Sequence, residues 1–246
     1  MPSPSDLLAV LHDAADAVAA ALARVDDRRA PGTRLGQYGI DLVADDAAVP
    51  VLVAAGLGVL SEESGFRAGS SGLVAVLDPV DGSTNASRGI PWYATSICVL
   101  DDDGPLVALV ADQATPRRFT AHRGGGAFAD GSPIRPSAVT DLASAVVALS
   151  GYPATHLGWR QFRALGAAAL DLCAVAAGVV DAYVDCSVDA HGPWDYLAGL
   201  LVCTEAGAHV AEARGRDLVV RGHADRRTPV AASTSALLAS TMAALG

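Results

Sequence analysis

The chain contains no lysine: all 17 of its basic residues are arginines, against 27 acidic residues and a net charge of −10. A protein that grips nucleic acid through its phosphates needs a stripe of basic side chains. We therefore expect no nucleic-acid partner. An acidic protein can nevertheless bind a phosphorylated small molecule where metal ions reverse the charge of its site.

Cysteines and long apolar runs are also scarce. The four cysteines form no C-x-x-C pair and lie among apolar or small residues, so we expect buried, reduced thiols. No apolar run approaches the roughly 18 residues of a membrane span. The first residues lack the basic and apolar regions of a signal peptide. We therefore expect no membrane partner and a cytoplasmic location. The 51% hydrophobic content is enough for a sizeable core.

Apolar periodicity predicts several helices. The first covers residues 5–29 and is ended by Pro31 and Gly32, and a short second one covers about 46–57. Pro50 fits that second helix only in its first turn. Further helices are predicted over 159–179, over the segment "WDYLAGLLVCTEAGA" and over 235–245.

Strand patterns divide the chain near residue 137. Residues 1–136 are rich in strands, with "LVAVLD" as a buried strand, a hairpin around "DDDGP" and a strand–turn–strand in "RFTAHRGGGAFADGSPI". Residues 137–246 alternate strands with helices. We expect an α+β half followed by an α/β half, joined in one compact unit.

Acidic residues follow predicted strands or open a predicted helix at three places. They are the pair Glu62 and Glu63, the pair Asp78 and Asp81, and Asp195. Taken singly, each has a simple explanation: a solvated surface pair, a turn, or a helix N-cap. Taken together they fit a ligand site, since ligands gather at strand ends in α/β folds.

The segment "DPVDGST" is the most informative of the three. Its two carboxylates and a backbone carbonyl, that of Val80, can hold a hard cation. Gly82, Ser83 and Thr84 can then cradle a phosphate, especially if they open a helix. Oxygen-only ligands favour Mg²⁺ or Mn²⁺ over zinc.

These motifs carry a family resemblance. "SEESG", "DPVDGSTN" and "PWDYLAG" resemble the three signature motifs of the inositol monophosphatase family, in the metal-dependent, lithium-sensitive sugar phosphatase superfamily. "QATPRRFTAHRGGGAF" and "FRALGAAALDLCAVAAGVVDAYVD" resemble other parts of the family, so the likeness covers about residues 41–211. The resemblance implies a layered αβαβα sugar-phosphatase sandwich.

The resemblance also implies roles for individual residues. Glu62 would ligate a first metal, Asp78 would bridge two metals, and Val80 would give its carbonyl to the first. Asp81 and Asp195 would ligate the second metal. Glu63 would lie next to the metal ligands without binding the metal itself. Ser83 would position water and phosphate together with Gly82 and Thr84, and Asp185 would accept hydrogen bonds from substrate hydroxyls.

One motif departs from the family. Where the family reads roughly "DLVTxxD", with a last Asp that helps to hold a third metal, this chain reads "DLVADDA", which places Ala44 and Ala47 at the Thr and Asp. Asp45 or Asp46 would serve if the loop shifted by one residue, and otherwise the third site is lost. The segment before "WD" is also longer, and it adds Asp189 and His191.

The resemblance implies hydrolysis of a small phosphomonoester, such as an inositol monophosphate, by metal-activated water. It implies two or three Mg²⁺ ions, Mn²⁺ as a substitute, inhibition by Li⁺ and Ca²⁺, and a homodimer. Fructose bisphosphate, phosphoadenosine phosphate and histidinol phosphate are alternative substrates. A homologue that binds without efficient turnover is an alternative of another class.

Overall fold

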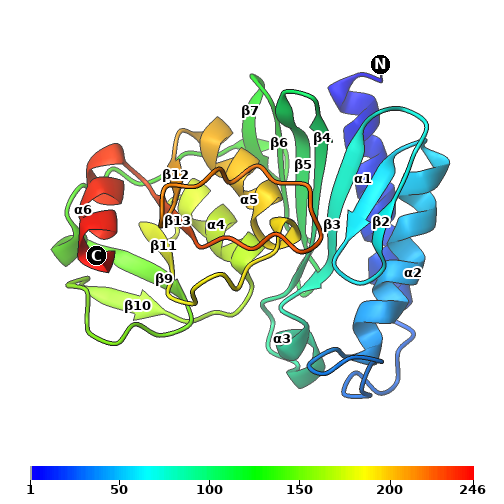
Figure 1. The fold of residues 1–246 in the computed structure, drawn as a ribbon, viewed down its shortest axis with the longest axis horizontal. Coiled ribbons are helices and arrows are strands. Elements are labelled where there is room, and N and C mark those ends of the chain that lie inside the picture. Colours follow the sequence, from blue (N-terminus) through cyan, green and yellow to red (C-terminus); the bar gives the residue numbers. More distant parts are fainter. Residues whose placement is uncertain (1) are drawn as a thin grey trace.

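The computed structural model describes residues 2–246, which fold into five alternating layers of helix and sheet (Figure 1). Helices α1 (Pro4–Leu22) and α2 (Gly39–Ala54) cover one face of a first sheet. Helices α4 (Ala168–Ala176) and α5 (Pro193–Ala206) lie between the two sheets, and α6 (Ser235–Leu245) covers the far face of the second. The expected layered sandwich is confirmed.

The first sheet has the strand order β2-β1-β3-β4-β5-β6-β7-β8. Strand β1 runs parallel to β3, and every other neighbouring pair in this sheet is antiparallel. The predicted hairpin around "DDDGP" is the β4–β5 pair. The strands are β1 (Gly58–Ser61), β2 (Gly65–Arg67), β3 (Val74–Asp81), β4 (Ala94–Asp101), β5 (Gly104–Asp112), β6 (Arg118–His122), β7 (Gly126–Ala129) and β8 (Ser132–Pro133).

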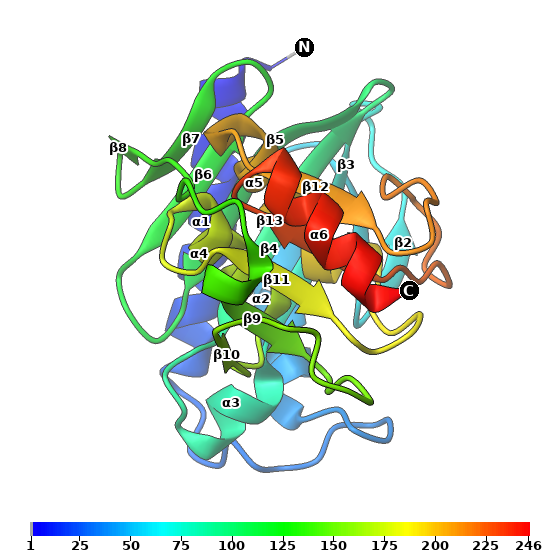
Figure 2. The same ribbon diagram turned by 90° about the vertical axis from the view of Figure 1, so that its left-hand side faces the viewer.

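The second sheet has the order β10-β9-β11-β13-β12 and lies behind α6 in Figure 2. Strands β10, β9 and β11 are parallel, whereas β13 is antiparallel to both of its neighbours. The strands are β9 (Val146–Ser150), β10 (Gln161–Arg163), β11 (Ala182–Asp185), β12 (His209–Glu212) and β13 (Pro229–Ala232), and a 3₁₀ turn at Leu142–Ser144 precedes them.

The middle layer is closely packed because Gly199 leaves room for the side chain of Leu172. A side chain at Gly199 of α5 would come within 2.6 Å of the Leu172 side chain on α4. Both helices are buried over most of their length, and they contact the inner faces of both sheets. Among residues 2–246, no helix has the length and apolar content needed to cross a membrane.

Two predicted helices have wrong bounds in the first half. Helix α1 ends at Leu22 rather than at residue 29. Helix α2 begins at Gly39, well before residue 46, so Pro50 lies inside it rather than in its first turn. The missing N–H of Pro50 leaves the carbonyl of Asp46 unbonded. Both residues are exposed, so water can reach that part of the helix.

The long helix expected over 159–179 is also wrong. Gly166 adopts φ +89° and separates a loop and the short strand β10 from α4, which begins only at Ala168. Trp159 packs against the rings of His156 and Phe162 within this loop, at 4.8 and 6.1 Å between ring centroids. Their apolar spacing therefore reflects an aromatic cluster and not a helical stripe.

Candidate metal centre

The carboxyl end of β3 presents Asp78 and Asp81. The pairing of β3 with β4 shifts register between these two residues, so the strand bulges there. The Asp78 carboxylate accepts the Val80 N–H at 3.0 Å, and Thr95 donates its hydroxyl to the Pro79 carbonyl at 2.9 Å. Asp78, Val80 and Asp81 are all buried. The bulge therefore holds two carboxylates at the end of a buried strand in a fixed conformation.

Two other elements bring carboxylates to the same place. Glu62 follows β1, which is parallel to β3, and its N–H donates to the Leu77 carbonyl at 3.1 Å. Asp195 lies in the first turn of α5. Oxygen atoms of Glu62, Asp78 and Asp195 lie within 4.8 Å of one another. The three side chains thus form an oxygen-lined cluster of a size that suits a metal ion.

Asp81 stands beside this triplet and is fixed from the other half of the chain. Its two carboxylate oxygens accept the N–H groups of Ala168 and Ala169 at 3.2 and 2.7 Å. These amides open α4, where the helix dipole favours a negative charge. The first sheet and the middle helices are therefore joined at this carboxylate.

Burial and mutual repulsion raise the pKa values of Glu62, Asp78 and Asp81. Burial and the charge of Asp195 raise the pKa of Glu62 to about 8 and that of Asp81 to about 7. Burial and the charge of Glu62 raise the pKa of Asp78 well above its usual range. Crowded carboxylates of this kind are relieved by protons or by cations. The donor set fits Mg²⁺, because it contains only oxygen.

Asp41 is a residue of this region that sequence reasoning missed. It lies at the third position of α2, where one carboxylate oxygen accepts the Tyr38 N–H at 2.8 Å. Its other oxygen is buried and has no hydrogen-bond partner among residues 2–246. Burial raises the pKa of Asp41 to about 7, despite the Tyr38 hydrogen bond. It shares a pocket of about 280 Å³ with Glu62, Glu63 and Ser83.

The structure brings neither Asp45 nor Asp46 into that pocket. Asp45 is buried and accepts the Ser61 hydroxyl, and Asp46 is exposed on α2. Both line a separate cavity of about 140 Å³. The sequence signal that could have found Asp41 is an acid three residues beyond a helix start at Tyr38.

Glu63 faces the same pocket as Asp41, but its charge is already engaged. The side chains of Arg34 and Gln37 both donate to one of its carboxylate oxygens. The Ser61 hydroxyl oxygen accepts the Glu63 N–H at 3.1 Å. Glu63 therefore ties the loop that precedes α2 to the end of β1.

The chain turns sharply after Asp81, in the segment that the sequence predicts as a phosphate cradle. Gly82 adopts φ +84°, and a side chain there would come within 3.1 Å of the Trp92 carbonyl. The short helix α3 (Ser83–Arg88) follows. Ser83 lines the pocket of Asp41, whereas Thr84 is exposed and lies 3.5 Å from the Tyr38 hydroxyl.

Asp185 ends β11 and is buried. One oxygen accepts the Ser187 N–H at 2.8 Å, and the other lies 3.7 Å from Nε2 of His191. Burial raises the pKa of Asp185 to about 6. Asp189 points elsewhere, because its carboxylate pairs with Arg214 and Arg216 at 2.9 and 2.5 Å.

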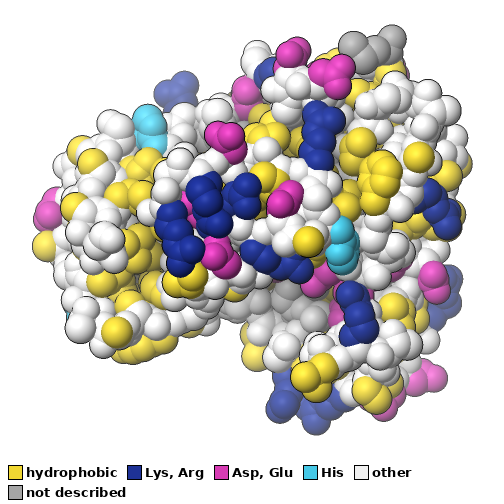
Figure 3. Space-filling model, in the orientation of Figure 1, with side chains coloured by type: hydrophobic (Ala, Val, Ile, Leu, Met, Phe, Trp, Pro, Cys, Tyr) yellow, Lys and Arg dark blue, Asp and Glu magenta, His cyan; other side chains and the backbone are white. Residues whose placement is uncertain are grey.

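The loop that joins β12 to β13 extends to the carboxylate cluster. His223 contacts the Glu62 carbonyl at 3.0 Å through Nε2, and its ring lies 4.9 Å from that of Trp194. The Arg226 guanidinium lies over the Trp194 ring, 5.1 Å from its centroid. Figure 3 shows basic side chains gathered over this loop, with a hollow below it.

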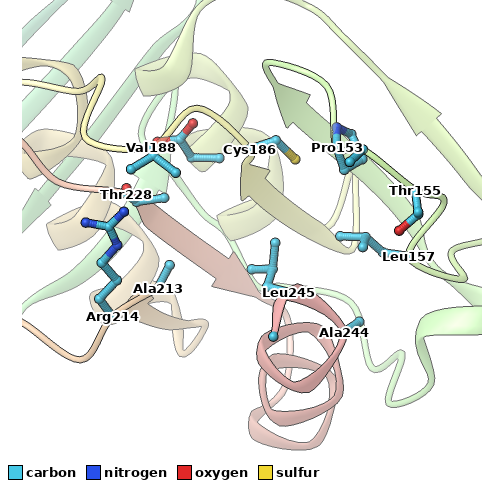
Figure 4. Close-up of a pocket in the computed structure, with 13 residues that line it drawn as sticks. Pro153, Thr155, Leu157, Cys186, Val188, Ala213, Arg214, Thr228, Ala244 and Leu245 are labelled. Atoms are coloured by element: carbon cyan, nitrogen blue, oxygen red, sulfur yellow. The ribbon is translucent and has the colours of Figure 1, made fainter.

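A cavity of about 340 Å³ lies farther along the edge of the second sheet (Figure 4). Arg214 and Thr228 stand on one side, Pro153 and Leu157 on the other, and Leu245 of α6 closes it below. Its lining is both apolar and polar and includes Asp185, but it contains none of Glu62, Asp78, Asp81 and Asp195. The candidate metal centre is therefore the carboxylate cluster at the end of β3.

The five layers and the acidic bulge between them define a sandwich of the sugar-phosphatase type. A family model described as the inositol monophosphatase family matches residues 55–245, and the chain belongs to that family. The fructose-1,6-bisphosphatase of Pyrococcus furiosus is 32% identical over 210 residues, which cover 84% of this chain and 82% of that protein.

Two further relatives extend this picture. The Nus factor SuhB of Vibrio cholerae is 36% identical over 188 residues, 70% of this chain and 69% of that one. The crystal structure of the extragenic suppressor protein suhB from Bartonella henselae superposes with a TM-score of 0.83 over 98% of each chain, at 27% identity. The similarity thus includes proteins named for an enzyme activity and proteins named for other roles.

Proposed function

We propose that this protein is a Mg²⁺-dependent phosphomonoesterase. The observation that carries the proposal is the approach of Glu62, Asp78 and Asp195 within 4.8 Å, with Asp81 beside them. Four carboxylates bring four negative charges, which two divalent cations would neutralise. Without cations the same pocket would repel a phosphate dianion.

In this proposal, Glu62, Asp78 and the Val80 carbonyl would hold one ion, and Asp81 and Asp195, together with Asp78, would hold a second. Bound Mg²⁺ supplies Lewis acidity, lowers the pKa of water and orients the phosphate. The protein contributes rigidity, since hydrogen bonds fix Asp78 and Asp81 in place. Such preorganisation is a major source of catalytic rate.

Asp41 takes the role first sought at Asp45 or Asp46. Its free oxygen is buried beside Glu62, Glu63 and Ser83, and it has no partner in the part of the chain that the structure describes. A carboxylate in this position can accept a hydrogen bond from a water molecule or help to hold a third ion. The Ser83 hydroxyl can donate to that water or to the phosphate, and Gly82 leaves the adjacent backbone accessible.

The substrate in this proposal is a small phosphorylated polyol. Asp185 is a buried acceptor at the end of β11, suited to the hydroxyls of such a molecule. The relative named fructose-1,6-bisphosphatase supports a sugar phosphate as one member of this class. Histidinol phosphate and phosphoadenosine phosphate remain alternatives to be tested in the same assay.

The decisive experiment is a panel of phosphomonoesters assayed with Mg²⁺ and with a chelator. We expect phosphate release from at least one sugar or polyol phosphate, abolished by the chelator and restored by Mg²⁺ or Mn²⁺. Li⁺ and Ca²⁺ should inhibit. Release that persists in chelator would contradict the metal mechanism.

A role based on binding without turnover is the second candidate. It is favoured by the relatives named Nus factor SuhB, at 36% identity. The panel separates the two candidates: a chain that binds Mn²⁺ but hydrolyses nothing on the panel would support the binding role. Measurable Mg²⁺-dependent turnover would support the enzyme.

A further inference from the structure

His191 lies in the loop between β11 and α5, where backbone and side chain are both held. Its backbone pairs with Arg227 in an isolated antiparallel bridge, with N–H to carbonyl distances of 3.3 and 2.8 Å. Its side chain is only 14% exposed. The residue is therefore no freely moving loop histidine.

The Nδ1 side of the ring faces Asp195. Nδ1 lies 3.3 Å from Oδ2 of Asp195, and the Gly192 N–H donates to the same oxygen at 2.7 Å. A carboxylate can only accept, so Nδ1 carries the hydrogen. Both contacts fall on Oδ2. The structure records no hydrogen bond to Oδ1 from any residue in 2–246, and that oxygen is the one left for a ligand.

The Nε2 side of the ring faces a second set of polar groups. The Tyr183 hydroxyl lies at 3.0 Å, the Ser150 hydroxyl at 3.1 Å and Oδ2 of Asp185 at 3.7 Å. Tyr183 is fully buried in the core that lies between the two sheets. These contacts prevent the ring from turning away from Asp195, since rotation would strip both nitrogens of their partners.

We infer that His191 is a positioning residue that holds Oδ2 of Asp195 through Nδ1, so that Oδ1 is presented to the carboxylate cluster of Glu62 and Asp78. The inference rests on the proposed function, in which these carboxylates bind Mg²⁺. Groups that orient a metal ligand in this way typically change metal affinity by about 10- to 100-fold when they are removed. Tyr183 and Ser150 do not contact Asp195 in this arrangement; they hold the His191 ring in place.

Two amide substitutions separate the two sides of the ring. The side-chain nitrogen of Asn occupies roughly the place of Nδ1, whereas that of Gln reaches the place of Nε2. His191→Asn therefore retains a donor to Asp195, and His191→Gln loses it while retaining a polar group near Tyr183 and Ser150. If His191 only supported the fold, Mn²⁺ binding would not be weaker in His191→Gln than in His191→Asn. His209→Asn is the matched control, because His209 is exposed on β12.

The test is titration of the metal-stripped full chain with Mn²⁺, followed by electron paramagnetic resonance, with thermal unfolding as a check of folding. We expect His191→Gln to bind Mn²⁺ at least about 10-fold more weakly than the wild type. His191→Asn should stay within about threefold, and His209→Asn should match the wild type. If His191→Gln does not fold, Tyr183→Phe replaces it, with an expected loss of about threefold.

The outcomes distinguish the inference from the proposed function. Wild-type affinity in His191→Gln, or equal losses in the Gln and Asn variants, would overturn the positioning role alone. Unchanged affinity in Tyr183→Phe would overturn it where the Gln variant cannot be measured. A wild-type chain that binds no Mn²⁺ would overturn the proposed function and the inference with it.

Discussion

Asp81 accepts the N–H of Ala169 at 2.7 Å, so an acid that ends a strand of the first sheet caps a helix of the second half. The same carboxylate also accepts the N–H of Ala168 at 3.2 Å. Fixed donors of this kind leave it little freedom to move when a ligand binds. The contact fixes the position of Asp81 in the cluster and joins the two halves of the chain at this point.

Replacing Asp81 by Asn tests its place in the cluster. The substitution keeps the size of the side chain but removes one charge, so we expect turnover to fall by roughly 10²-fold or more. The unfolding temperature in chelator should not fall by much, because the change also relieves repulsion with Asp195. Turnover with and without saturating Mg²⁺, together with thermal unfolding, measures both effects. Near-wild-type turnover would remove Asp81 from the metal site.

Asp41 and Asp46 form a matched pair on α2. Asp41→Asn should lower turnover by about 10-fold or more and change its Mg²⁺ dependence, because its unpaired oxygen faces Glu62 and Ser83. Asp46→Asn should be silent, since that side chain is exposed. Mg²⁺ activation curves for both variants provide the measurement. Equal effects of the two substitutions, or no effect of Asp41→Asn, would show that Asp41 is not the acid that holds the water or a third metal ion.

The stability of the metal-free protein should fall as the pH rises. The pKa values of Asp41, Glu62 and Asp81 are raised by burial to about 7, about 8 and about 7. In the unfolded chain the corresponding pKa values are about 4. Between pH 4 and pH 8 the folded state therefore binds more protons, and its advantage is lost as these groups ionise.

Mg²⁺ should reverse this trend, because metal ligands must be deprotonated. We expect the gain in unfolding temperature on adding Mg²⁺ to be larger at pH 8 than at pH 6. Thermal unfolding at both pH values, with Mg²⁺ and with chelator, measures it. An unfolding temperature in chelator that rises steadily from pH 5 to pH 8 would contradict the proposed protonation of the cluster.

Asp185 is expected to govern the choice of substrate. Asp185→Ala should raise KM for a polyol phosphate far more than for p-nitrophenyl phosphate, because losing a buried acceptor costs about 1–3 kcal/mol only where a hydroxyl would pair with it. Asp189→Ala is the control, since its carboxylate pairs with Arg214 and Arg216. Equal losses on the two substrates would show that Asp185 supports the fold or the cluster instead.

The parts of the site that the sequence predicts are the local ones. Asp78 and Asp81 end an apolar strand and Asp195 opens a helix, so a few neighbouring residues set their backbone conformation. The amides that fix the Asp81 side chain come from α4, far along the chain. Asp41 escaped prediction because its role depends on where α2 begins, and that start is set by the contact with the Tyr38 N–H. The segment "DLVADDA" begins with Asp41, but the family pattern places the third-metal acid at its end, which points to Asp45 and Asp46 instead.

Long-range contacts account for the other errors. Gly166 stops the helix expected over 159–179, and a side chain there would come within 3.1 Å of the Asn85 amide. Asn85 in turn donates to the carbonyls of Trp92 and Leu165, both at 2.7 Å. His223 reaches the Glu62 carbonyl across most of the chain. Helical periodicity carries no information about such partners.

The capping of α4 by Asp81 makes the contact between the two halves measurable by amide exchange. The amides of Ala168 and Ala169 can exchange with solvent only when their hydrogen bonds to Asp81 break. Their hydrogen–deuterium exchange rates therefore measure how often the contact between the end of β3 and the start of α4 opens. Exchange at this single turn would show whether the strand end and the helix separate before the whole chain unfolds.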